Sequence, residues 1–210
     1  SDISLLVDAD HGYGNALSVM RTIDELETAG VAAMTIEDTI LPQRFGHQGQ
    51  EELIPIGEMI GKLKAAVTAR QDPTTVIIGR THSLNATNQA DAIERVKAFE
   101  ATGVDVIFLL GIKEVDQLEA IRKVTALPFM LGTVAEALDN AILAPYGVKM
   151  VLRGHGTFNA AVKAIYHSLK HQAEGGMPST VAETHADADL MGIATGNASY
   201  KEWRGAYLSE

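Results

Sequence analysis

The sequence predicts an α/β protein built from a parallel β-sheet covered by helices. Two observations support this class: short, continuous apolar runs end in polar residues, as buried parallel strands do, and stretches with helical spacing of apolar residues separate them. Strands and helices therefore alternate in units of about 20 to 40 residues. The predicted strands are Ser4–Val7, Ala32–Ile36, Thr75–Gly79, Val104–Leu110, Phe129–Leu131 and Lys149–Leu152.

Helices are predicted between the strands, where apolar residues recur every three or four positions. Gly30, Gly103 and Gly147 each stand where a helix cap would precede the next apolar run. The apolar positions of three such helices are Met59, Leu63, Ala66 and Val67; Val115, Leu118, Ile121 and Val124; and Phe158, Val162, Ile165 and Leu169.

The polar residues that follow the strands predict that the sheet closes into a (β/α)8 TIM-type barrel. Such residues converge on one point only in a closed ring, whereas an open doubly wound sheet gathers them at a single switch point. A barrel needs eight strands, so we expect the first two βα units, roughly 70 to 80 residues, to be missing from this chain. The polar residues concerned are Asp8, Asp10, Glu37, Asp38, Arg80, His82, Thr133, Arg153 and His155.

Residues 1–175 are predicted to form the barrel domain, from its third strand to its eighth helix, and residues 176–210 a C-terminal helical extension. The extension carries Tyr200, Trp203 and Tyr207 among polar residues. These aromatic side chains either cover the protein's own barrel or pack on a partner subunit.

Composition limits the class of function. The chain of 210 residues has a formal net charge of −10 and no basic run, so we expect no nucleic-acid partner, because phosphate-backbone binding needs clustered Lys and Arg. No apolar stretch approaches the roughly 20 residues of a membrane helix, and no signal peptide is recognisable. The absence of cysteine excludes a disulfide framework, a thiolate zinc site and a thiol nucleophile. These features predict a cytoplasmic enzyme without a membrane partner.

Three carboxylates at successive strand ends predict a metal site. The run Asp8-Ala9-Asp10-His11-Gly12-Tyr13-Gly14-Asn15 directly follows one predicted strand, and Glu37 ends the next. Crowded carboxylates repel one another unless a cation joins them, and Mg²⁺ prefers oxygen ligands and keeps several waters. We therefore predict Mg²⁺, with Mn²⁺ as a substitute, held by Asp8, Asp10 and Glu37. The alternative is that these acids merely cap the helices that follow.

Two further residues are candidates for contact with a ligand. Arg80 ends the run Thr75-Val76-Ile77-Ile78-Gly79-Arg80, and its guanidinium suits a carboxylate because it can donate two parallel hydrogen bonds. The alternative role for Arg80 is to pair with the acids and hold them together. His155 lies between glycines at the last strand end, where we expect it to face the mouth of the barrel.

These residues resemble the isocitrate lyase and phosphoenolpyruvate mutase superfamily over essentially the whole chain. The resemblance implies a barrel with Mg²⁺ near Asp8, Asp10 and Glu37, and with Arg80 on the substrate carboxylate. It also implies a mobile loop over the mouth, at about Thr39–Ile54, and a homotetramer, a dimer of dimers that exchange a terminal helix. The matching stretches are Asp8–Asn15, Ile36-Glu37-Asp38, Pro42-Gln43-Arg44-Phe45-Gly46-His47 and Gly79-Arg80-Thr81.

The loop residues favour one branch of that superfamily. The carbon–carbon lyases resemble the chain around Arg44 but carry a proton-transferring cysteine where it has Phe45, and no other thiol is present. The oxaloacetate decarboxylase branch resembles it better, with Phe-Gly in the loop and a histidine matching His155. A tyrosine expected in that branch near Thr133 is Val134 here.

The resemblance implies a small 2-keto diacid substrate and decarboxylation of oxaloacetate to pyruvate and CO₂, with the metal ion stabilising the developing enolate. The alternatives are a lyase of methylisocitrate or a 2-alkylmalate, a phosphoenolpyruvate mutase or phosphonopyruvate hydrolase, and a barrel that binds a keto acid or metal without turnover. The expected catalytic residues are Asp10, Arg80 and His155, and the expected substrate contacts are Arg80, His155, Phe45, Gly46 and His47.

Overall fold

The computed structural model describes residues 3–46, 49, 51–154 and 156–208; for residues 182–184 it describes the backbone only. The chain divides into two compact units, Ser1–Gly154 and His155–Glu210. The predicted boundary between a barrel and a helical extension, at residue 175, stays a prediction.

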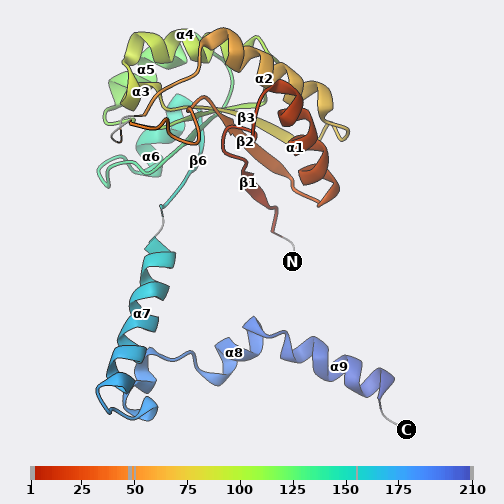
Figure 1. The fold of residues 1–210 in the computed structure, drawn as a ribbon, viewed down its shortest axis with the longest axis vertical. Helices are drawn as coiled ribbons and strands as arrows, with labels where there is room; N and C mark the ends of the chain where they lie inside the picture. The colour runs from red at the N-terminus through yellow and green to blue at the C-terminus, as the bar shows by residue number, and fades with distance from the viewer. Residues whose placement is uncertain (1–2, 47–48, 50, 155, 209–210) are drawn as a thin grey trace. The chain divides into compact units, whose positions relative to one another are not determined.

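The first unit is a curled sheet of six parallel strands in the order β1 to β6 (Figure 1). All six predicted strands are confirmed, with ends that shift by a few residues. In the described part of the chain, β1 and β6 are the edges of the sheet, so what is seen is a half-barrel rather than a closed ring. The strands are β1 Leu6–Asp8, β2 Ala33–Glu37, β3 Val76–Thr81, β4 Val106–Leu109, β5 Phe129–Leu131 and β6 Val148–Val151.

Helices cover one face of this sheet, as Figure 1 shows for α1, α2, α4 and α5. Asn15 caps α1, because its side-chain oxygen accepts hydrogen bonds from the backbone of Leu17 at 3.0 Å and Ser18 at 3.3 Å. The helices of this unit are α1 Ala16–Thr28, α2 Ile56–Ala69, α3 Ser83–Ala86, α4 Gln89–Glu100, α5 Val115–Arg122 and α6 Asn140–Leu143, followed by the 3₁₀ turn η1 Ala144–Tyr146.

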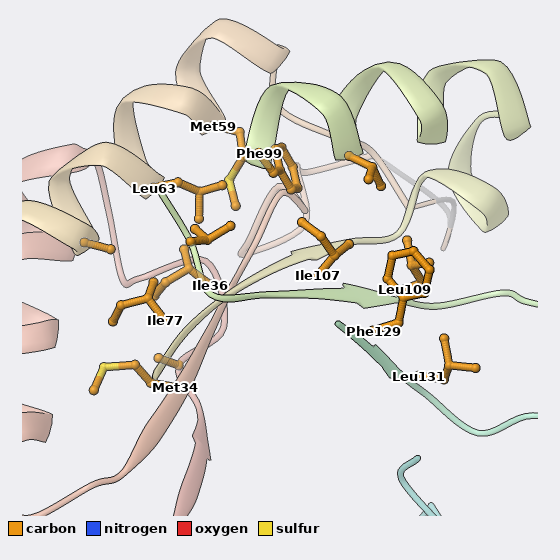
Figure 2. Packing of buried hydrophobic residues seen from close by; sticks show 14 of the residues in the cluster. Met34, Ile36, Met59, Leu63, Ile77, Phe99, Ile107, Leu109, Phe129 and Leu131 are labelled. Carbon is orange, nitrogen blue, oxygen red and sulfur yellow. The ribbon is translucent and has the colours of Figure 1, made fainter. Parts of the chain in front are cut away.

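Both faces of the sheet are apolar. Ile77 and Ile78 are fully buried on opposite faces, since successive side chains of a strand alternate. The face under the helices forms the larger core, in which Phe99 of α4 packs with strand residues such as Ile36 and Ile107 (Figure 2). Burial on both faces explains why these strands appear in the sequence as continuous apolar runs rather than alternating ones.

Strand register sets the carboxyl ends of neighbouring strands beside one another. Asp8 of β1 pairs with Thr35 of β2, and Glu37 of β2 pairs with Arg80 of β3. Acidic and basic side chains at successive strand ends are therefore neighbours in space, which is the basis of the site described below.

The second unit consists of α7 Gly156–Ala173, the 3₁₀ segment η2 Pro178–Thr184, α8 Ala188–Ala194 and α9 Asn197–Tyr207. Its described apolar residues are largely exposed: Phe158, Ile165 and Leu169 of α7 are 68%, 60% and 62% exposed. Among the described residues, no helix combines the length and the apolar character needed to cross a membrane.

Candidate active site

Three of the predicted site residues meet at the carboxyl ends of β1, β2 and β3. Arg80 donates from Nη1 to Oδ2 of Asp8, and its Nε lies 2.9 Å from Oε2 of Glu37. The guanidinium therefore joins two carboxylates that would otherwise repel each other. Its side chain is 13% exposed, which strengthens this pairing relative to one at the surface.

The turn after β1 presents Asp8 and Asp10. Oδ1 of Asp8 accepts hydrogen bonds from the backbone of Asp10 at 3.1 Å and from the hydroxyl of Thr35 at 3.0 Å. Asp10 has a φ of 46°, an uncommon value for a residue with a side chain, and its carbonyl accepts from the backbone of Glu37 at 2.8 Å. The turn is thus tied to the end of β2 through its backbone.

Gly12 allows this turn to pass close to α1. Its φ is +77°, and a Cβ at this position would lie 2.4 Å from Cγ2 of Val19. Glycine is required here for two reasons, since a side chain would be both strained and in collision.

Glu37 and His82 form a buried, charge-complementary pair. Nε2 of His82 lies 3.1 Å from Oε2 of Glu37, and the Thr39 hydroxyl donates to the other Glu37 oxygen. Burial alone would raise the pKa of the Glu37 carboxyl, but the hydrogen bonds from His82 and Thr39 and the charge of Arg80 hold it below its ordinary value. Burial alone would lower the pKa of His82, but Glu37 outweighs it, so the pKa is raised.

A pocket of about 130 Å³ lies between this pair and the segment that follows β2. His82 contributes to its wall, and from the segment Glu51 reaches the ring, with Oε2 at 3.0 Å from Nδ1. Arg44 and Glu52, 3.6 Å apart, also line it. The wall of the pocket therefore carries charges of both signs beside Glu37 and His82.

Asp38 holds the end of β3 through hydrogen bonds to its side chain. It is fully buried, and its carboxylate accepts from the Thr81 hydroxyl at 2.6 Å, from the His82 backbone at 3.2 Å and from Arg95 at 3.1 Å. Arg95 also donates to the carbonyl of Ile54 at 3.1 Å. Burial raises the pKa of Asp38 above its ordinary value, despite these favourable partners. The network fixes His82 and one end of the segment that follows β2.

Lys62 of α2 supports the turn after β1. It is only 2% exposed and donates to the carbonyl of His11 at 2.9 Å. Burial lowers the pKa of Lys62. Burial also lowers the pKa of His11, and the nearby charge of Lys62 adds to that effect.

The donor set fits a hard divalent cation in its chemistry. Asp8 and Glu37 offer carboxylate oxygens, with the hydroxyls of Thr35 and Thr39 bonded to them, and Mg²⁺ accepts such ligands directly or through water. Within the described ranges, however, no three His, Asp or Glu side chains gather closely enough to hold one ion. Here Arg80 supplies the positive charge between Asp8 and Glu37, while the charge of Asp10 acts on His11 and Tyr13.

The other predicted residues are less closely associated with this centre. Arg80 has the acid-pairing role that the sequence left open as its alternative, and a contact with substrate stays a prediction. Phe45 is fully exposed, and Gly46 beside it has a φ of 83°. His47 and His155 lie outside the described residues.

The sequence placed His82 among the polar residues at strand ends but gave it no role in the site, and it did not single out Glu51. His82 lies two positions after Arg80, directly after the last residue of β3, and that spacing keeps both residues at the same strand end. That spacing was a usable signal. Glu51 had none, because its position depends on how the segment after β2 folds back, through the bridge between Thr39 and Leu53.

Comparison with known proteins adds to this geometry. The family model of phosphoenolpyruvate phosphomutase matches residues 1–173. An oxaloacetate decarboxylase of Paraburkholderia xenovorans (strain LB400) is 44% identical over 210 residues, covering 100% of this chain and 70% of that protein. A phosphoenolpyruvate phosphomutase structure from Streptomyces platensis subsp. rosaceus is similar with a TM-score of 0.88 and 25% identity, covering 100% of this chain and 75% of that one. A phosphonopyruvate hydrolase in complex with oxalate and Mg²⁺ gives 0.85 and 30%, covering 100% and 74%.

Proposed function

Because the chain belongs to the phosphoenolpyruvate phosphomutase family, we propose that it is a lyase that decarboxylates oxaloacetate, or a close 2-keto diacid, to pyruvate and CO₂. The observation that carries the proposal is the meeting of Asp8, Glu37 and Arg80 at adjacent strand ends. The second support is that the chain is 44% identical to a protein named oxaloacetate decarboxylase.

We propose Mg²⁺ as the cofactor, held by Asp8 and Glu37 with Asp10 acting through water. Bound there, the ion would supply Lewis-acid stabilisation of negative charge on the substrate's keto oxygen. The support is the all-oxygen donor set and the Mg²⁺ present with the similar phosphonopyruvate hydrolase. Mn²⁺, with the same preference for oxygen, is expected to substitute.

The protein's own residues would bind and orient the substrate. When the bond between C3 and the distal carboxylate breaks, its electrons move toward the keto oxygen and CO₂ departs. Arg80 would hold the carboxylate next to the keto group, exchanging part of its pairing with Asp8 and Glu37 for that contact. His155 would orient the departing carboxylate or return a proton to C3, and the loop carrying Phe45, Gly46 and His47 would exclude water.

The chain lacks the thiol used by the carbon–carbon lyases of the isocitrate lyase and phosphoenolpyruvate mutase superfamily. It contains no cysteine, and Phe45 stands at the loop position concerned. A phenyl ring cannot exchange a proton, whereas decarboxylation needs no thiol before the bond breaks. This favours decarboxylation over cleavage of methylisocitrate or a 2-alkylmalate.

We further propose that the half-barrel is part of a (β/α)8 TIM-type barrel that lacks its first two βα units here. The matches to relatives leave room for this, since the chain spans 70% of the decarboxylase named above. A homotetramer with exchanged terminal helices, a cytoplasmic location and a small 2-keto diacid as the partner stay predictions.

A substrate panel tests the proposal. Purified protein with Mg²⁺ is incubated with oxaloacetate, phosphonopyruvate, methylisocitrate and 2,3-dimethylmalate, each with and without a chelator, and the products are identified by NMR. We expect chelator-sensitive turnover of oxaloacetate above the rate with metal alone. If the protein turns over another member of the panel and consumes oxaloacetate no faster than the metal alone does, the proposal is wrong.

A further inference from the structure

The two ring nitrogens of His82 have different surroundings. Nε2 faces Glu37 and Arg80: it lies 3.1 Å from Oε2 of Glu37 and 3.1 Å from Nε of Arg80. Nδ1 faces the opposite way, 3.0 Å from Glu51 Oε2, but without the alignment of a hydrogen bond. The His82 side chain is only 8% exposed, so within the described residues Nδ1 is a buried polar atom that lacks a hydrogen bond. The Glu51 carboxylate is its charged neighbour, and a partner with better hydrogen-bond alignment would stabilise the atom further.

His82 lines the pocket described above, and the two residues of the contact between His82 and Glu51 differ in how firmly they are held. The backbone of His82 donates to the buried carboxylate of Asp38 at 3.2 Å, directly after β3. Glu51 lies in coil and its side chain is 42% exposed, so its carboxylate can exchange this contact for one with water. The histidine is therefore the fixed member of this contact and the glutamate the displaceable one.

We propose that Nδ1 of His82 is the donor for the distal carboxylate of the diacid substrate, and that Glu51 occupies its place until the substrate displaces it. The inference deepens the proposed function and rests on it for the assignment of a diacid to this pocket. His82 thereby determines specificity: it distinguishes a diacid from a monoacid of the same length.

The chemistry of the present contact supports a carboxylate as the ligand. The group now beside Nδ1 is itself a carboxylate, so the position already accepts that charge. Arg80, the candidate for the proximal carboxylate, lies at the opposite nitrogen of the same ring. A small diacid held by Arg80 would extend past the imidazole toward Nδ1. Two carboxylates cannot share one donor without repulsion, so Glu51 and substrate must compete.

The test compares two ligands that differ only at the distal end. Malate carries the second carboxylate, and 2-hydroxybutyrate has a methyl group in its place. Binding of each to the purified chain with Mg²⁺ is measured by calorimetry. We expect the wild type to prefer malate, and Glu51→Gln to bind malate about 3- to 10-fold more tightly, with little change for 2-hydroxybutyrate.

Two substitutions of His82 separate its nitrogens. In His82→Gln the amide takes the position of Nε2 and can still meet Glu37, whereas in His82→Asn the amide takes the position of Nδ1. We expect His82→Gln to lose about tenfold or more in malate affinity, the size of a hydrogen bond to a charged group, and His82→Asn to retain part of the preference. Neither should change 2-hydroxybutyrate affinity to the same degree.

Glu94→Gln is the control, because it removes one carboxylate charge from an exposed position of α4 that does not line this pocket. It should change the malate to 2-hydroxybutyrate ratio less than Glu51→Gln does. Equal shifts for both ligands, or no preference for malate in the wild type, would overturn the inference. Turnover is measured separately: a diacid preference without decarboxylation overturns the proposed function alone, and decarboxylation without the preference overturns this inference alone.

Discussion

Arg80 is the residue on which the charge balance of the site depends. It bridges Asp8 and Glu37, and Glu37 in turn holds the pKa of His82 above its ordinary value. Each of these groups is stabilised by its neighbours, so removal of one leaves the others with uncompensated charge in a partly buried place.

Replacement of Arg80 should therefore be severe. We expect Arg80→Gln to lower kcat/KM for oxaloacetate by on the order of 100-fold or more, since both the substrate clamp and the bridge between acids are lost. Steady-state kinetics measures this. Arg21→Gln, which removes an exposed arginine paired with Glu25 on α1, should leave the kinetics unchanged. Comparable losses in both variants would contradict the assigned role.

Gly12 should be intolerant of a side chain. We expect Gly12→Ala to reduce the free energy of unfolding by about 1 to 3 kcal/mol, from the left-handed φ and the collision with Val19. Chemical denaturation gives the value. Gly30→Ala is the control, because it has a φ of +84° but no atom within 4 Å of the added Cβ, so it should cost only the φ component. A smaller loss at Gly12 than at Gly30 would be inconsistent with this packing.

At the scale of elements, Glu27 ties the end of α1 to the turn before β3. Its carboxylate accepts from the backbone of Gln71 at 2.8 Å and of Asp72 at 2.6 Å, and from the Thr75 hydroxyl at 3.1 Å. Burial alone would raise the pKa of Glu27, but these hydrogen bonds prevail and lower it. A carboxyl with a lowered folded-state pKa stabilises the fold above its ordinary pKa, and that contribution is lost as the pH falls through the folded value.

Glu27→Gln should accordingly flatten the acid side of the stability profile. Between about pH 5 and about pH 3, the wild type should lose more free energy of unfolding than the variant, because only the wild type must protonate this carboxylate. Denaturation at a series of pH values provides the comparison. Glu25→Gln, on the same helix but in an exposed pair with Arg21, should follow the wild type. Parallel profiles for wild type and Glu27→Gln would refute the assignment.

Elements were the most predictable level of this protein. The strands could be found because both sheet faces are buried, which leaves continuous apolar runs such as Ile77 and Ile78 in β3. The contact of Asp8 and Glu37 with Arg80 followed from their places at strand ends. The contact of Glu51 with His82 could not be predicted, because it depends on the path of an aperiodic segment. The described strands form a curled half-barrel with β1 and β6 at its edges, so closure into a barrel stays a prediction.

At the scale of the whole molecule, the apolar stripe of α7 is not covered by the described residues of its own unit. Phe158, Val162, Ile165 and Leu169 recur at helical spacing and are exposed. Apolar area of this kind marks a contact surface in folded proteins. We propose that a second chain covers it, in keeping with the expected exchange of terminal helices.

Assembly should therefore depend on this stripe. We expect the wild type to sediment as a species larger than one chain, and Ile165→Asp to shift it toward the single chain, because a charge cannot be buried unpaired in an apolar interface. Lys163→Asp, a change on α7 outside the stripe, serves as the control. A wild type that sediments as a single chain across the micromolar range would contradict the proposal.

We propose that acids at adjacent strand ends serve a metal-assisted decarboxylation. The most direct measurement is the rate of CO₂ release from oxaloacetate as Mg²⁺ is titrated, for the wild type and for Asp8→Asn. We expect a saturable, Mg²⁺-dependent rate above the metal-only reaction in the wild type, and its loss in Asp8→Asn, which keeps the size of the side chain but removes its charge. A wild-type rate equal to that of metal alone, or an Asp8→Asn variant as active as the wild type, would contradict it.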